Sequence, residues 1–81
     1  MDKQIHTNWQ THINEHPFYK QFYTWSPHLF YTYYVYNKEG NFVAEVLNLN
    51  SVEYIGSDLT SERAKTQCKN HFKNIGETNN G

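Results

Sequence analysis

Two histidines and a glutamate near the N-terminus have the residue types and the spacing of a zinc-dependent catalytic motif. His12, Glu15 and His16 follow the order H-x-x-E-H, in which two histidines one helical turn apart bind zinc and the glutamate acts as a base. A catalytic zinc also needs a third protein ligand and a substrate cleft, and Pro17 distorts the turn that carries His16. We therefore expect an amphipathic helix with two half-exposed histidines, no metal site and no cofactor.

The other side chains with chemical potential are predicted to have structural roles. Cys68 and His71 lie three residues apart, but Cys68 falls in an apolar helical stripe, where a cysteine behaves as a small hydrophobic residue. The candidate carboxylates scatter over two strands, a loop and a helix start: Glu45, Glu53, Asp58 and Glu62. No glycine-rich phosphate-binding loop is present. The sequence thus predicts no catalytic residues, and we do not expect an enzyme.

Length and charge restrict the class of protein further. The chain has 81 residues, 37% of them hydrophobic, and a formal net charge of −1. This length predicts one domain, residues 1–81, with frayed tails at 1–7 and 76–81. No run approaches the roughly 18 apolar residues of a membrane span, and no signal peptide is recognisable. The single cysteine excludes an internal disulfide and favours a cytoplasmic location.

Aromatic residues dominate the apolar fraction. The chain contains seven Tyr, five Phe and two Trp, and most of them lie between Phe18 and Tyr36. Because each aromatic side chain can bury about 150–250 Å², they can build the core of a short chain. Tyrosine also prefers half-exposed positions and is common at binding surfaces. The same residues are therefore candidates for both the core and a partner interface.

The predicted element order is α-β-β-β-α, an α+β fold. The spacing of Trp9, His12, Ile13 and His16 indicates a helix capped by Thr7 or Asn8. After it we expect a further helical turn at 18–25, with a chain break at Ser26 and Pro27, and strands at 29–36, 42–49 and 52–55. A C-terminal helix follows, which Thr60 caps and Gly76 ends. The three strands would form an antiparallel sheet. The C-terminal helix, with the stripe Ala64, Cys68, Phe72 and Ile75, would cover one face, and the N-terminal helix would lie beside the sheet.

The turn at residues 37–40 sets which side chains share a face. We expect a three-residue loop with a bulge, Gly40 in the left-handed position and Asn37 opposite Asn41. In this register the C-terminal helix covers a face formed by Leu29, Tyr31, Tyr33, Val35, Val43, Glu45, Leu47 and Leu49. The other face carries the candidate partner-binding residues Phe30, Tyr34, Tyr36 and Phe42. Either the N-terminal segment or a partner would cover that aromatic face.

Basic residues on the C-terminal helix define an alternative. Arg63, Lys65, Lys69 and Lys73 cluster there, and the three lysines are spaced four apart. Such a row is usually a solvated helix face, but it could contact phosphates in a salt-dependent way. Aromatic strands can also stack on single-stranded bases. A nucleic-acid-binding module that uses the sheet aromatics and this row is therefore the second hypothesis.

The chain resembles two known families of small domains. From Tyr31 to Phe72 it resembles the HicB-like antitoxin domain, through Gly40, the segment Phe42-Val43-Ala44, and the progression Gly56, Asp58, Thr60, Glu62 and Ala64. That resemblance implies a non-enzymatic partner of another protein. The element order and residues 56–65 also look like a double-stranded-RNA-binding domain. Ser61-Glu62 stands where that family has a basic pair, so RNA binding is not carried over.

These observations favour a small protein-binding module. We expect stoichiometric docking of the aromatic surface onto a host protein, as in a phage or mobile-element inhibitor of a host enzyme or defence complex. A homodimer is the alternative occupant of that surface.

Overall fold

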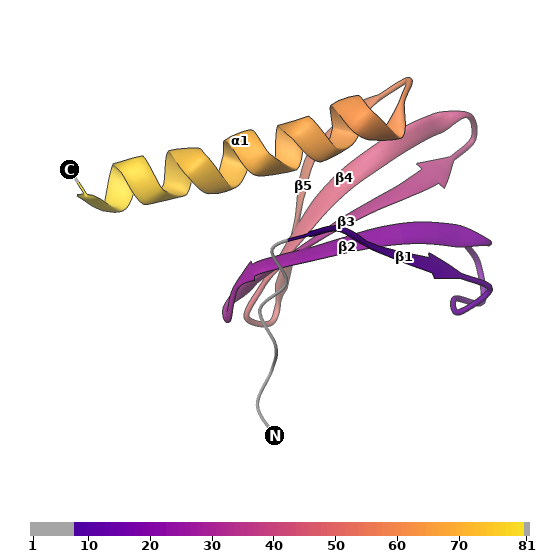
Figure 1. The fold of residues 1–81 in the computed structure, drawn as a ribbon, viewed down its shortest axis with the longest axis horizontal. Coiled ribbons are helices and arrows are strands. Elements are labelled where there is room, and N and C mark those ends of the chain that lie inside the picture. The colour runs from indigo at the N-terminus through magenta and orange to yellow at the C-terminus, as the bar shows by residue number, and fades with distance from the viewer. Residues whose placement is uncertain (1–7, 81) are drawn as a thin grey trace.

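Five strands and one helix make up the computed structural model, which describes residues 8–80 and the side chains of residues 8–75. The strands are β1 (Gln10–Ile13), β2 (Gln21–His28), β3 (Tyr31–Lys38), β4 (Asn41–Asn48) and β5 (Ser51–Asp58), and the helix is α1 (Ser61–Asn80). Each strand pairs antiparallel with the next, in the order β1-β2-β3-β4-β5 (Figure 1). The helix continues through Gly76, so the expected end there is wrong. The expected tail at 1–7 and Gly81 lie outside the described residues.

The prediction of three strands and an N-terminal helix is wrong. Residues 10–13 form β1 and residues 21–28 form β2, and both strands overlap the region predicted to be helical. The spacing of Trp9, His12 and Ile13 suits a helix over so short a window, but β2 contains a run of aromatic and β-branched residues with high strand propensity. Pairing of β1 with β2, and of β2 with β3, satisfies the backbone of this segment instead.

Ser26 and Pro27 were expected to break the chain, but β2 continues through them. The pairing of β2 with β3 shifts between Trp25 and His28, where two β2 residues stand opposite Thr32. A bulge is a position at which a strand can contain proline, because its missing N–H is not required by the ladder. The bulge also allows the Ser26 hydroxyl to donate a hydrogen bond to Thr32 Oγ1 at 3.2 Å.

The predicted register between β3 and β4 is wrong by one residue. Lys38 pairs with Asn41 and Asn37 with Phe42, which leaves a two-residue loop. Its residues Glu39 and Gly40 have φ values of 55° and 93°, as a type I′ turn requires at both central positions. A slip of one residue moves every β4 side chain to the other face of the sheet. Phe42, Ala44 and Val46 therefore share a face with Tyr33 and Val35.

The helix packs across β3, β4 and β5 on that face (Figure 1). The predicted stripe is confirmed in its first two positions, because Ala64 and Cys68 are fully buried, and Phe72 packs against the core. Thr60 caps the helix as predicted, since its Oγ1 accepts a hydrogen bond from the Arg63 N–H at 3.2 Å. The buried residues are Trp25, Ser26, Tyr33, Val35, Ala44, Val46, Ala64 and Cys68.

The opposite side of the sheet is called the open face below. Its residues are Gln10, His12, Phe22, Thr24, Thr32, Tyr34, Tyr36, Val43, Glu45, Leu47, Val52, Tyr54 and Ser57. No helix or strand of the described chain lies across it; only the loop of residues 14–20 folds back onto one part.

The helix α1 lacks the apolar character of a helix that could cross a membrane, and it is the sole helix in the described residues.

Candidate binding site

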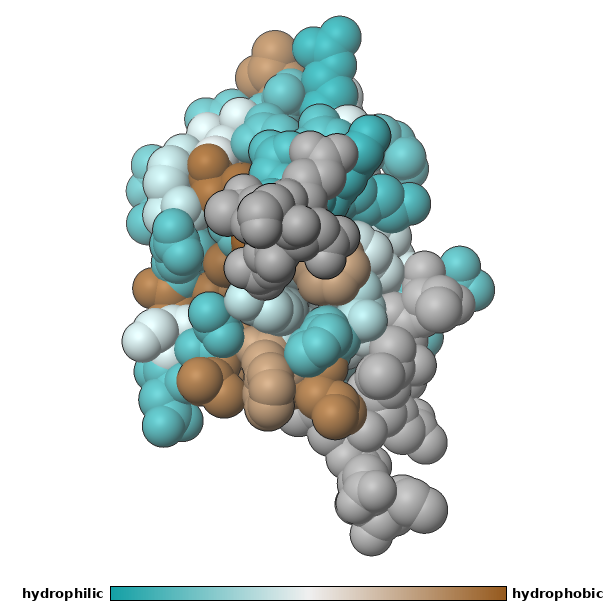
Figure 2. All heavy atoms as spheres, turned by 90° about the vertical axis from the view of Figure 1, so that its left-hand side faces the viewer, coloured by the Kyte–Doolittle hydropathy of each residue, from teal (hydrophilic) through white to brown (hydrophobic). Residues whose placement is uncertain are grey.

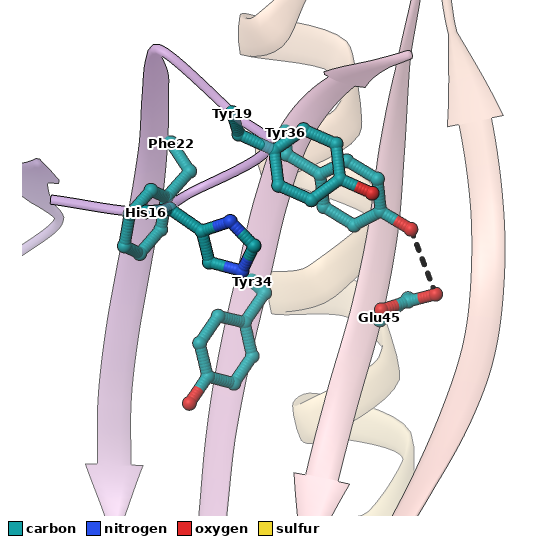
Figure 3. A pocket seen from close by; sticks show the side chains of 6 residues that line it. All are labelled: His16, Tyr19, Phe22, Tyr34, Tyr36 and Glu45. Carbon is teal, nitrogen blue, oxygen red and sulfur yellow. Dashed lines mark hydrogen bonds between the residues drawn. The ribbon is translucent and has the colours of Figure 1, made fainter. Parts of the chain in front are cut away.

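A hollow of about 160 Å³ lies on the open face where the loop of residues 14–20 meets the sheet. Its lining is aromatic except for one carboxylate and one imidazole: His16, Tyr19, Phe22, Tyr34, Tyr36 and Glu45. Figure 3 shows these side chains converging from the loop and from β2, β3 and β4. This hollow is called the aromatic pocket below.

The sheet register places four of these side chains together. Phe22 on β2 stands opposite Tyr36 on β3, and Tyr34 stands opposite Glu45 on β4. Antiparallel partners point to the same face and lie about 4.5–5.5 Å apart. The floor of the aromatic pocket is therefore fixed by backbone pairing across three adjacent strands.

The loop supplies the remaining wall. Asn14 reverses the chain with a φ of 59°, and its N–H donates to the Lys20 carbonyl at 2.8 Å. Asparagine tolerates this left-handed conformation better than most residues. The return brings the Tyr19 ring to 4.4 Å from the Tyr36 ring, measured between centroids. His16 is oriented by a hydrogen bond that its Nδ1 accepts from the Phe18 N–H at 3.0 Å.

Glu45 places a negative charge at one end of the aromatic pocket. The Tyr36 hydroxyl donates a hydrogen bond to Glu45 Oε2 at 2.9 Å (Figure 3). Burial, followed by this hydrogen bond, raises the pKa of Tyr36 well above its usual range. Among the described residues no lysine, arginine or histidine forms an ion pair with Glu45. The pocket thus combines electron-rich rings with a carboxylate that has no ion-pair partner among the described residues.

The H-x-x-E-H residues do not have the helical geometry that the zinc pattern requires. His12 lies in β1 and His16 in the loop, so the two are not one helical turn apart. Glu15 Oε1 accepts a hydrogen bond from His12 Nδ1 at 2.9 Å, and His12 Nε2 lies 2.8 Å from Thr24 Oγ1. Within residues 8–75, no three His, Cys, Asp or Glu side chains are grouped to hold a metal.

The structure separates the four residues predicted to bind a partner. Tyr34 and Tyr36 lie together on the open face, in the aromatic pocket. Phe42 lies on the helix-covered face and packs against the core, as the corrected register requires. Phe30 is in the β2–β3 turn and its side chain is 53% exposed. The N–H of Leu49, in the β4–β5 turn, donates a hydrogen bond to the Phe30 carbonyl. Figure 2 shows apolar side chains gathered at this end of the molecule.

The basic row lies on the other side of the sheet from Tyr34 and Tyr36. Lys69 and Lys73 are exposed on α1, and Arg63 lies 3.8 Å from the Asp58 carboxylate. Lys65 is half-buried, because its Nζ lies 4.0 Å from the centroid of the Tyr23 ring. The sheet aromatics of the open face and the basic row therefore do not form one continuous surface.

Cys68 has the structural role predicted for it. Its side chain is fully buried, and burial raises the pKa of its thiol to about 12. A reactive cysteine needs a lowered thiol pKa and some exposure. His71 lies on the same side of α1, with Nδ1 2.9 Å from the Tyr33 hydroxyl. Burial raises the pKa of that hydroxyl above its usual range, so the histidine satisfies a buried polar group.

Four residues of the aromatic pocket were not predicted to belong to a site: His16, Tyr19, Phe22 and Glu45. Phe22 and Tyr19 were assigned to a helical turn, and Glu45 was placed on the helix-covered face by the one-residue register error. The alternation of Phe22 and Thr24 with Tyr23 and Trp25 was the sequence signal for a strand with two faces.

Comparisons with protein-family models, with curated proteins and with solved structures found no match to this chain.

Proposed function

We propose that this chain is a non-enzymatic protein-binding module that docks onto another protein through the open face of its sheet. The observation that carries the proposal is the apolar character of that face across β2 to β5. Val52 and Tyr54 are 65% and 62% exposed there, beside half-buried Tyr34 and Leu47. Large contiguous apolar patches on soluble domains mark interaction sites, and tyrosine is favoured at the centres of such sites.

We infer that the module acts as an inhibitor. A short module can block an enzyme or a defence complex by stoichiometric docking, without catalysis of its own. A host protein in the cytoplasm would be its partner, and a phage or mobile element its source. The resemblance to the HicB-like antitoxin domain supports a role as the partner of another protein.

Affinity capture with the tagged full chain tests the proposal. A host lysate is divided, one half is treated with nuclease, and both are passed over the wild type and two variants. Tyr34→Ser/Tyr54→Ser alters the open face, and Lys69→Glu/Lys73→Glu alters the exposed helix as a matched control. We expect a stoichiometric protein band that resists nuclease, is lost with the tyrosine variant and is retained with the lysine variant.

The opposite pattern would overturn the proposal. Capture that disappears with nuclease and with the lysine variant would assign the function to nucleic acid and to α1. A circular-dichroism melt of each variant shows that it is folded; Tyr54 is largely exposed, so its replacement should cost less than about 1 kcal/mol. Light scattering of the isolated chain tests the homodimer, since a dimer disrupted by Tyr34→Ser/Tyr54→Ser would make a second copy the occupant of the open face.

A further inference from the structure

We propose that the aromatic pocket holds an alkylammonium group, the head of a lysine side chain of the partner, with or without N-methyl groups. This inference rests on the proposed function, because it names the chemistry that the open face recognises.

The lining favours a cation. Tyr19, Tyr34, Tyr36 and Phe22 present aromatic rings, whose negative faces attract ammonium groups within about 6 Å of the ring centroid. Glu45 adds a carboxylate with which no lysine, arginine or histidine of the described chain forms an ion pair. Aromatic side chains around one carboxylate form an arrangement suited to recognition of a substituted ammonium ion.

The protein already contains one contact of this kind on its other face. Lys65 Nζ lies 4.0 Å from the Tyr23 ring centroid and 5.6 Å from the Trp9 ring centroid. That ammonium comes from the chain itself and covers the aromatic edge of the core. On the open face, no described lysine or arginine lines the aromatic pocket, so within the described residues the pocket has no equivalent ammonium of its own.

The size of the pocket and the geometry at Glu45 favour ammonium over guanidinium. A hollow of about 160 Å³ exceeds the roughly 10–15 Å³ needed for one water molecule, so it admits a branched group of several heavy atoms. Guanidinium binds best when it reaches both oxygens of a carboxylate. Glu45 Oε2 already accepts a hydrogen bond from the Tyr36 hydroxyl, and no described side chain forms a hydrogen bond with Glu45 Oε1. One free oxygen suits a compact ammonium.

Titration with tetramethylammonium chloride tests the site directly. The aromatic carbon–proton signals of the full chain are followed by NMR at constant ionic strength, with sodium chloride replaced as the ligand is added. We expect saturable shifts of the Tyr34, Tyr36 and Phe22 signals, with a Kd on the order of millimolar. Tert-butanol, which is uncharged and of similar shape, should cause no saturable shift. Equal binding of both compounds would overturn the proposal.

Two substitutions separate charge from shape. Glu45→Gln should weaken tetramethylammonium binding roughly tenfold, and Glu53→Gln, at an exposed position of β5, is the matched control that should not. Tyr36→Phe keeps the ring but frees Oε2, so guanidinium should gain affinity relative to tetramethylammonium. Unchanged binding by a folded Glu45→Gln variant would overturn the role of the carboxylate.

A competition assay distinguishes this inference from the proposed function. Tetramethylammonium and an N-acetylated trimethyllysine amide are added to the captured partner. Displacement of the partner supports both proposals. A partner captured through the open face that neither compound displaces would overturn the inference and leave the proposed function standing. Pocket binding with no captured protein would overturn the proposed function and the lysine as the source of the cation.

Discussion

Replacing Glu39 with asparagine is expected to stabilise the protein, because Glu39 has a left-handed backbone conformation that asparagine tolerates better. Its φ is 55°, and Gly40 beside it has a φ of 93°. Left-handed geometry costs an ordinary L-residue roughly 1–2 kcal/mol, and Asn-Gly is the preferred pair for a type I′ turn. Relief of part of that cost should raise the free energy of unfolding by about 0.5–1 kcal/mol, which corresponds to an increase in Tm of about 2–8 °C.

Two further variants isolate the cause. Glu39→Gln removes the charge without improving the backbone preference, so it should change stability by less than about 0.5 kcal/mol. Gly40→Ala should destabilise by about 1–2 kcal/mol. A Cβ on Gly40 would meet no atom within 4 Å, so this loss comes from the backbone alone. Thermal and urea unfolding, followed by circular dichroism, provide both quantities.

The result that would refute the reasoning is equal stability of Glu39→Asn and Glu39→Gln. In a three-residue loop with a bulge, Gly40 alone is left-handed and Glu39 has ordinary right-handed geometry. Asparagine would then offer no advantage at position 39. The comparison therefore distinguishes the observed register, with Lys38 opposite Asn41, from the register with Asn37 opposite Asn41.

Three other expectations concern the helix and its contacts. Thr60→Ala should lower the free energy of unfolding by about 1 kcal/mol, measured in urea, because the Arg63 N–H loses its capping acceptor. Burial raises the Cys68 pKa from 9.0 to about 12. The neutral buried thiol therefore contributes its full stability below pH 9, and this contribution is lost as the pH rises from 9 towards 12. Cys68→Ala should flatten this part of the profile of unfolding free energy against pH, measured in urea. Lys65→Met should cost about 0.5–1 kcal/mol through loss of the Tyr23 contact, whereas Lys69→Met should not.

The C-terminal half of the fold could be predicted because its signals are local. Thr60 lies just before the helix, and Ala64 and Cys68 follow at helical spacing, so cap and buried stripe agree. The strand at β3 was equally clear, since a run of aromatic and β-branched residues has few alternatives. In these segments the residues near one another in sequence determine the structure.

The N-terminal half could not be predicted with the same rules because its pairing is not local. Trp9, His12 and Ile13 fit a helix by spacing, yet His12 pairs with Phe22 and its ring stacks on the Phe22 ring at 4.6 Å. Trp9 stacks on Trp25, whose centroid is 5.6 Å away. These contacts outweigh the weak preference of a short helix, which is marginal below about 12–15 residues.

Glu45 is the residue that could have corrected the register, and with it the site. With Asn37 opposite Asn41, Glu45 would share a face with Tyr33 and Val35, both of which are fully buried beneath α1. A carboxylate there would lose its hydration without a cationic partner, at a cost of several kcal/mol. The observed register moves Glu45 to the open face, opposite Tyr34, where Tyr36 bonds to it. The cost of burying one charge therefore favours the two-residue turn, and the same choice assembles the aromatic pocket.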